Sequence, residues 1–171
     1  PPSEQIKATL HTALDAMDPA KRGALMNEAL VPKPGHAPDP EVRQAVNDYF
    51  KGKIESGQVT PDHFRGLDPK VSADAIKQLA GGDDKQRADL RNLMRDPAFA
   101  KTLAPALQDM TPEGRQQVLH FVGENASHVT GTLELALNEM KPPSRRTEIL
   151  HDAFAKGDRL AVEAANRYEA S

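Results

Sequence analysis

Three nearly identical nine-residue phrases constrain the fold more than any other feature of the sequence. They read TLHTALDAM at residues 9–17, TLAPALQDM at 102–110 and TLELALNEM at 132–140. The apolar positions of the first copy are Ile6, Leu10, Ala13, Leu14 and Met17, and the other copies repeat these offsets. Residues three, four and seven apart lie on one face of an α-helix, so each phrase predicts a helix with one buried stripe.

Each phrase is followed by a signal for a tight turn and a second helix. The turn signals are Asp18-Pro19, Thr111-Pro112 and Lys141-Pro142. Asp or Thr before Pro is typical of a helix N-cap followed by the first helical position, where the missing N–H of Pro costs nothing. Each phrase therefore predicts a helical hairpin, that is, two antiparallel helices joined by a short turn.

Weaker copies of the phrase lie in the intervals around the strong ones. They read AVNDY ending at Tyr49, AIKQL ending at Leu79 and AANRY ending at Tyr168. The ends of successive copies are 28 to 32 residues apart along the chain. A period in this range, sustained over the whole sequence, predicts about five tandem helical hairpins.

The individual helices can be placed from this pattern. First helices of the hairpins are predicted near 3–17, 39–54, 69–80, 97–110, 127–140 and 158–169, and second helices near 19–30, 84–95, 112–124 and 143–156. The segment VPKPGHAPDP at 31–40 predicts an extended loop. Gly81-Gly82 predicts a break, with Asp83 or Asp84 capping the helix that follows.

The segment 50–67 is predicted to be the least regular part of the chain. Thr60-Pro61 can start only one short helical turn through Phe64, because Gly66 and Asp68-Pro69 follow closely. Function often concentrates on such irregular connections. We therefore predict that His63, Phe64 and Arg65 contribute to partner binding.

Composition agrees with an all-α fold and excludes several classes of protein. A chain of 171 residues fits a single domain, here 1–171, and with 4% aromatic residues and no Trp the core must be built from Ala, Leu, Val, Ile and Met. Because there is no Cys, disulfides, Cys nucleophiles and thiolate metal sites are excluded. The net charge of −3 and the mixed charges argue against nucleic acid as a partner. No apolar run is long enough to cross a membrane.

Three segments resemble the short HEAT-like helical repeats, whose phrase Asp-Pro-x-Val-Arg precedes an Ala-rich helix. The segments are APDPEVRQAV at 37–46, GLDPKVSADAIKQLAG at 66–81 and LMRDPAFAKTLAPALQDM at 93–110. Only the first keeps the Val42-Arg43 pair, and the copy at 127–140 lacks Asp-Pro. The resemblance implies an α-solenoid that binds protein partners and has no catalytic residues of its own. An irregular helical bundle built from duplicated hairpins is the alternative.

Arginine recurs at one position of the repeat and gives a second set of candidate partner-binding residues. They are Arg22, Arg115 and Arg145, with Arg87 and Arg146 near the same position. In a stack of hairpins equivalent positions form a ladder along one surface, which would suit an acidic partner. The alternative is local pairing with Asp15, Asp109 and Glu139 before each turn, which contributes only about a few tenths of a kcal/mol per pair.

No catalytic, cofactor-binding or metal-binding residue is predicted. His120 and His151 lie 31 residues apart and could meet on one face, but a repeat also duplicates residues without a role. The chain has no HExxH, and GGDD at 81–84 lacks both the Lys of a phosphate loop and the alternating acids of a calcium loop. The methionines that end the three phrases are predicted to fill the core, or else to form an adaptable binding face.

The leading functional hypothesis is a non-catalytic protein–protein interaction domain, with another protein as partner and no cofactor. The rival is a partner-positioning domain, such as a Cys-free helical ubiquitin ligase that docks a conjugating enzyme. Either could belong to a bacterial effector acting in the host cytosol, and a structural spacer is a third class. Because the sequence begins Pro1-Pro2-Ser3 without Met, we expect a fragment of a longer protein. The sequence predicts neither the compartment nor the oligomeric state.

Overall fold

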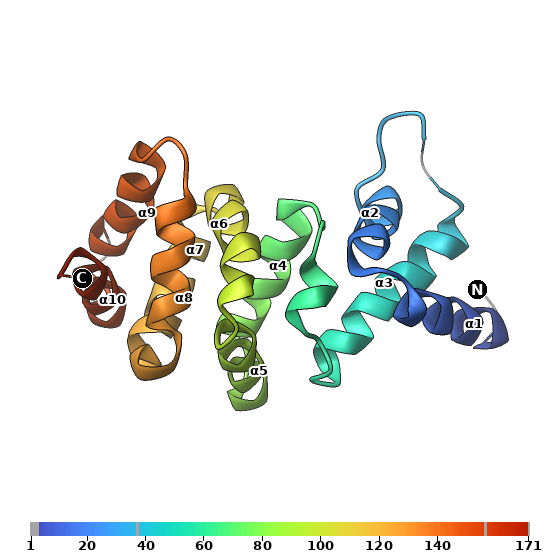
Figure 1. Ribbon diagram of the computed structural model, residues 1–171, viewed down its shortest axis with the longest axis horizontal. Coiled ribbons are helices and arrows are strands. Elements are labelled where there is room, and N and C mark those ends of the chain that lie inside the picture. The colour runs from blue at the N-terminus through green and yellow to red at the C-terminus, as the bar shows by residue number, and fades with distance from the viewer. Residues whose placement is uncertain (1–3, 37, 156, 171) are drawn as a thin grey trace.

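The computed structural model describes residues 4–36, 38–155 and 157–170, and this part of the chain is all-α (Figure 1). Its ten α-helices, with no strand among the described residues, confirm the predicted fold class. The helices are α1 (Glu4–Ala16), α2 (Pro19–Leu30), α3 (Pro40–Glu55), α4 (Pro69–Ala80), α5 (Asp84–Met94), α6 (Ala100–Asp109), α7 (Pro112–Glu124), α8 (Ala126–Glu139), α9 (Ser144–Ala155) and α10 (Arg159–Ala170). Two short 3-10 helices, η1 (Pro61–Phe64) and η2 (Pro97–Phe99), complete the set.

The predicted helices correspond one to one with these elements. The short turn predicted to end at Phe64 is η1. The helix predicted near 97–110 differs, because its first turn is the 3-10 helix η2 and the α-helical hydrogen bonds begin only in α6. Ser3, Ala37 and Lys156, which the predicted segments include, lie outside the described residues.

Asp and Thr side chains cap the helices where the sequence predicted turns. Asp18, Asp68 and Thr111 each accept a hydrogen bond from a backbone N–H in the first turn of α2, α4 and α7. Asp83 caps α5 by accepting from the N–H of Gln86 at 2.9 Å. Lys141 cannot accept in this way, and the helix that follows it begins only at Ser144, two residues beyond Pro142. The helix starts are thus fixed by local chemistry.

The helices follow one another in space much as they do in sequence (Figure 1). The segment α1–α3 lies at one end of the elongated molecule and α9 and α10 lie at the other, so the described chain runs from end to end. Helix α6 packs between α4 and α8, while α7 packs against α9 and α10. This order agrees with an all-α stack of hairpins.

The core includes the apolar stripes that the sequence predicted, but the expectation of a core without aromatic residues is wrong, since Tyr49, Phe64 and Phe121 are also buried in it. Every stripe position of the second and third copies is buried: Phe99, Leu103, Ala106, Leu107, Met110, Val129, Leu133, Ala136, Leu137 and Met140. In the first copy Leu14 is buried, but Ile6 is 58% exposed and Ala13 is also exposed, so the stripe prediction is wrong there. The reason is position: α1 is the end helix of the described chain and packs against α3 on one side.

Two helical glycines differ sharply in their surroundings, and this difference gives a test of the packing. A Cβ added to Gly123 of α7 would overlap the carbonyl of Leu160, whereas nothing lies within 4 Å of a Cβ added to Gly131 of α8. We expect Gly123→Ala to lower the free energy of unfolding by about 1–3 kcal/mol, although Ala is the better helix former.

The control Gly131→Ala is expected to raise the free energy of unfolding by about 0.5–1 kcal/mol, because it gains helix propensity without a clash. Urea unfolding followed by circular dichroism measures both changes. Equal effects at the two positions would contradict the close approach of α7 to the start of α10.

Candidate functional site

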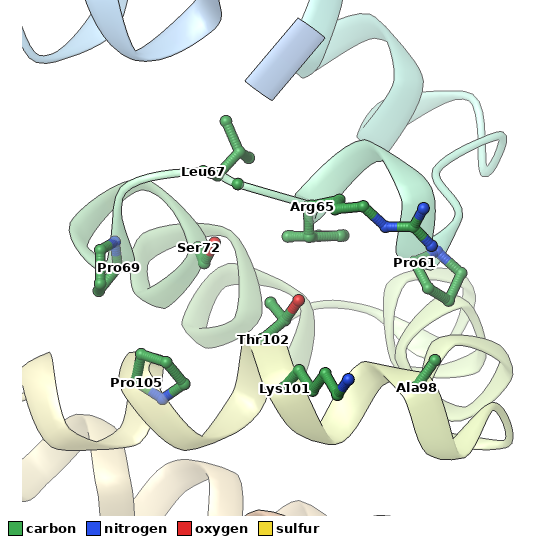
Figure 2. A pocket seen from close by; sticks show the side chains of 11 residues that line it. Pro61, Arg65, Leu67, Pro69, Ser72, Ala98, Lys101, Thr102 and Pro105 are labelled. Atoms are coloured by element: carbon green, nitrogen blue, oxygen red, sulfur yellow. The ribbon is translucent and has the colours of Figure 1, made fainter. Parts of the chain in front are cut away.

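A cleft with a volume of about 470 Å³ is the candidate functional site (Figure 2). Residues from the segment 61–72 form one wall, and residues from the segment 98–105 form the other. The first wall includes η1, the loop 65–68 and the start of α4, and the second includes α6. We call it the η1–α6 cleft. It contains Phe64 and Arg65, two of the residues that the sequence predicted for partner binding.

The cleft lies beside η1, which is much shorter than the α-helices around it. In chain order η1 takes the place of a second helix, but it has 4 residues where α2 has 12 and α7 has 13. It ends early because Gly66 has a φ of 74°, a conformation that favours glycine, and because Pro69 already starts α4. A single turn cannot cover the neighbouring helices as a full helix would, and we attribute the open space to this.

The loop wall of the cleft is held in place by α2. The side-chain amide of Asn27 donates to the carbonyl of Gly66 at 2.8 Å, and its oxygen accepts from the N–H of Asp68 at 2.7 Å. Gly23 of α2 lies so close to the loop that a Cβ would overlap the carbonyl of Arg65. These contacts from α2 fix the loop backbone on the side away from the cleft, so the cleft is preformed.

Aromatic side chains pack around Phe64 and hold η1 in place. Phe64 is 2% exposed, and its ring meets Phe50 edge-on at 5.6 Å between ring centroids and Phe99 at 5.3 Å. Edge-to-face contacts of this kind are stabilising and have specific geometry. Phe64 therefore contributes a rigid base for η1 rather than an exposed contact residue.

The charged residues that line the cleft are both basic. They are Arg65 and Lys101, and no acidic residue lines it. Arg65 pairs with Asp62 at 2.7 Å, but both side chains are more than half exposed, and such pairs contribute little and exchange readily. In Figure 2 both cationic groups point toward the end marked by Pro61 and Ala98, whereas Pro69 and Pro105 lie at the other end. The cleft thus has a cationic end and an apolar end.

Two hydroxyl groups lie between these ends, and one of them has no partner. Ser72 is 2% exposed, and its hydroxyl makes no hydrogen bond. Thr102 lies opposite it on α6 (Figure 2). A buried polar group without a partner is uncommon in folded proteins and is more often found at functional sites.

Sequence reasoning missed the α6 wall of the cleft, including Lys101, Thr102 and Pro105. One signal could have found it. Pro105 lies inside α6, and because Pro has no N–H the carbonyl of Lys101 loses its helical donor. A proline inside an otherwise regular helical phrase therefore indicates a carbonyl, one turn earlier, that lacks its helical hydrogen bond.

His63 lies in η1, but it belongs to a polar cluster with residues of α1, α2 and α3. Its Nδ1 accepts from the N–H of Thr60 at 2.9 Å, and its ring is tilted against Tyr49 at 6.3 Å. The Tyr49 hydroxyl donates to Oδ1 of Asp15 at 2.7 Å, and Nζ of Lys53 lies 3.1 Å from the same oxygen and 3.3 Å from Oδ2. The cluster links the first three helices to η1.

The pKa values of this cluster show which groups are charged. Burial raises the pKa of Tyr49 to about 12, and its hydrogen bond to Asp15 adds to this. Burial, together with the nearby charges of Arg22 and Lys53, lowers the pKa of His63. The hydrogen bond from Tyr49 lowers the pKa of Asp15 despite partial burial. At neutral pH the cluster therefore holds a carboxylate, a neutral imidazole and a neutral phenol.

Two of the repeated arginines bind the helix that precedes their own. Arg22 is 5% exposed and donates to the carbonyls of Leu14 and Asp62. Arg115 donates to the carbonyl of Leu107, again eight residues earlier, and pairs with Asp152 at 3.0 Å. The last carbonyls of a helix lack donors and carry partial negative charge, so they attract a cation.

The predicted local pairing with Asp15 and Asp109 is therefore wrong. Asp15 instead binds Tyr49 and Lys53, and the acid that pairs with Arg115 comes from α9. Both guanidinium groups are hydrogen-bonded within the fold, and both side chains are largely buried. Arg22 and Arg115 connect the helices of the fold.

The other three arginines lie apart from the η1–α6 cleft. Arg87 donates to the Gly82 carbonyl and pairs with Asp84 at the start of α5. Arg145 pairs with Glu148 on the surface of α9 at 3.3 Å, not with Glu139. Arg146 donates to Asn138 and to the Tyr168 hydroxyl, and so joins α9 to α8 and α10. Of the predicted residues, only Phe64 and Arg65 line the cleft.

His120 connects α7 with the start of α10. Its Nδ1 lies 2.9 Å from Asp158 and its Nε2 lies 3.2 Å from Glu124, whereas His151 is an exposed residue of α9. Partial burial tends to raise the pKa of Asp158, but the N–H of Ala161 and the contact with His120 outweigh it and lower the pKa. The structure therefore places His120 with two acids rather than with His151.

No protein-family model, curated protein or solved structure matches the chain. Among the described residues, no set of three His, Asp or Glu side chains is placed to hold a metal ion. None of the helices in the described part of the chain is long and apolar enough to span a membrane.

The unpaired hydroxyl of Ser72 leads to a stability prediction. We expect Ser72→Ala to raise the free energy of unfolding by about 1 kcal/mol, because it removes a buried polar group without a partner. The matched control is Thr132→Val, since the buried Thr132 hydroxyl donates to the carbonyl of Met94 at 2.5 Å. This variant is expected to lose about 1–3 kcal/mol. Loss of stability in both variants would indicate a structural partner for Ser72.

The lowered pKa of His63 predicts a loss of stability in mild acid. Because the unfolded chain binds a proton at His63 more readily, stability is full above the ordinary pKa of 6.5 and falls as pH decreases toward the folded value. We expect His63→Asn, which keeps an acceptor near Nδ1, to show a smaller loss between pH 7.5 and pH 5. Urea unfolding at several pH values measures this, and parallel profiles would contradict it.

Proposed function

We propose that the protein is a non-catalytic interaction domain that binds an acidic segment of another protein in the η1–α6 cleft. The observation that carries the proposal is the combination of a preformed apolar cleft with two basic residues and no acidic residue among those that line it; Asp62 of η1 pairs with Arg65 from beside the cleft. Charge complementarity of this kind selects acidic partners and rejects basic ones. Apolar walls supply the affinity that exposed charges alone do not.

The size and lining of the cleft support a segment rather than a large flat interface. A volume of about 470 Å³ lies in the range of pockets that enclose a small ligand, and so would enclose a few side chains. Three prolines and Leu67 present apolar surface that is already ordered before binding. Binding a segment here loses little conformational freedom on the side of the domain, which favours affinity.

We also propose that the chain is a distant member of the short HEAT-like helical repeats. Support comes from a buried Ala followed by a second buried apolar residue in five helices: Ala45-Val46 in α3, Ala75-Ile76 in α4, Ala106-Leu107 in α6, Ala136-Leu137 in α8 and Ala164-Ala165 in α10. Further support comes from Arg22 and Arg115, which make the same backward hydrogen bond at the same position of two hairpins. Proteins of this architecture commonly recognise partners along their surface.

Charge reversal at the cleft tests the proposed function. In affinity capture, the double variant Arg65→Glu and Lys101→Glu is used as bait in parallel with the unchanged domain. The control is Arg43→Glu with Lys33→Glu, since these residues are exposed, lie outside the cleft and change the net charge equally. We expect the cleft variant to lose at least about 90% of a retained partner, and the control to keep it, as a tenfold loss of affinity implies.

The captured partner is then purified, and its Kd for all three forms is measured by titration calorimetry. Equal binding by the unchanged domain and the cleft variant would contradict the proposal. Circular dichroism and thermal unfolding of each variant show that the fold is retained before binding is compared.

A further inference from the structure

The hydrogen-bonding groups of the η1–α6 cleft bear on the conformation of a bound segment. An extended peptide brings one N–H and one C=O per residue, and each needs a partner once it leaves water. The described residues include no strand whose edge could pair with it. Between the two ends, the polar side chains of the walls are Ser72 and Thr102, and the Ser72 hydroxyl is covered. An α-helix enters without this cost, because it pairs its own backbone groups.

The charges of the cleft give such a helix a direction. A helix carries partial negative charge at its C-terminus and partial positive charge at its N-terminus. Arg65 and Lys101 lie toward one end of the cleft, while Pro69 and Pro105 lie at the other (Figure 2). The C-terminal end of a bound helix is therefore favoured at the cationic end, and its N-terminal turns are favoured between the prolines.

We propose that the partner segment binds in the η1–α6 cleft as an amphipathic α-helix, with acidic residues in its last turn facing Arg65 and Lys101. This rests on the proposed function and states the form of its ligand. The apolar face of the helix, with residues three and four apart, lies against Leu67, Pro69 and Pro105.

A consequence is that the segment folds as it binds. Acidic residues in the last turn oppose the dipole of a free helix and weaken it. In the cleft the two cations remove this repulsion, so helix content rises with occupancy. A segment with its acids in the first turn behaves in the opposite way, since it is more helical when free but places its charges at the apolar end.

Designed peptides of about 15 residues, a length at which an isolated helix is marginal, provide the probe. The first peptide carries leucine at helical spacing and three glutamates in its last turn. The second has the same composition with the glutamates in its first turn, and the third is the first with a central proline. Each is acetylated, amidated and labelled with a fluorophore, and its Kd for the domain is measured by fluorescence anisotropy.

We expect the first peptide to bind at least about tenfold more tightly than either of the others. It gains helical signal in circular dichroism on binding. A nitroxide at its C-terminus broadens the amide signal of Ala98, whereas one at its N-terminus broadens that of Lys70. Ala98 lies at the cationic end of the cleft, and Lys70 directly follows Pro69, which lies at the other end.

Variants that remove the two positive charges test whether Arg65 and Lys101 cause the preference for the first peptide. Arg65→Gln with Lys101→Gln is expected to reduce binding of the first peptide at least about tenfold and to abolish its advantage over the second. Arg43→Gln with Lys33→Gln is expected to leave both unchanged. If the double variant does not fold, the single variant Lys101→Gln, at an exposed position, replaces it in this measurement.

Equal binding of the first and second peptides, or of the first and third, would overturn the proposal. Binding of no peptide, with charge-dependent capture of a whole protein retained, would show that the cleft recognises a folded surface, and the helix would be rejected while the proposed function stands. Capture that does not depend on the cleft charges would instead remove the proposed function itself.

Discussion

Most helices of this protein bury a narrow stripe of small and aliphatic side chains against their neighbours, and the rest of the structure depends on this constraint. With few aromatic residues and no Trp, most side chains of the core are too small to fill a wide gap. Helices must therefore approach closely, as α7 does at the start of α10, where Gly123 has no room for a Cβ. Close packing of small side chains makes the stack sensitive to any helix that is shortened.

Backbone carbonyls at the helix ends are the second constraint, and buried cations satisfy some of them. Arg22 reaches the end of α1 and also η1, so that a single side chain joins two successive hairpins. Burial of an unpaired guanidinium is costly, and two carbonyl acceptors compensate for part of the lost water, whereas the buried Nε of Arg22 makes no hydrogen bond to the described residues. The neighbouring cluster of Asp15, Tyr49 and His63 adds further hydrogen bonds at the same junction. Both sides of η1 are thus fixed, one by this cluster and the other by the aromatic rings under the cleft.

Local signals in the sequence predicted most of the fold, and the reason is that they act over a few residues. Asp or Thr before Pro fixes a helix start through one side-chain hydrogen bond, and the spacing of Ala and Leu fixes the buried face. Exposure of Ile6 could not be predicted in this way. The spacing of apolar residues shows which face of a helix can be buried, but not whether a neighbouring helix covers that face. The partners of Arg115 were missed for a similar reason, since Asp152 is distant in sequence and meets it only through packing.

The candidate site was predicted in part, and the missing part is the wall on α6. The irregular segment around Phe64 and Arg65 could be recognised because proline and glycine interrupt it. Lys101 and Thr102 lie in a regular helix, where exposed polar residues are ordinary, and only the folded arrangement brings them opposite Arg65. A cleft beside a short 3-10 helix has no sequence motif of its own, because its shape is set by elements that are distant from one another along the chain.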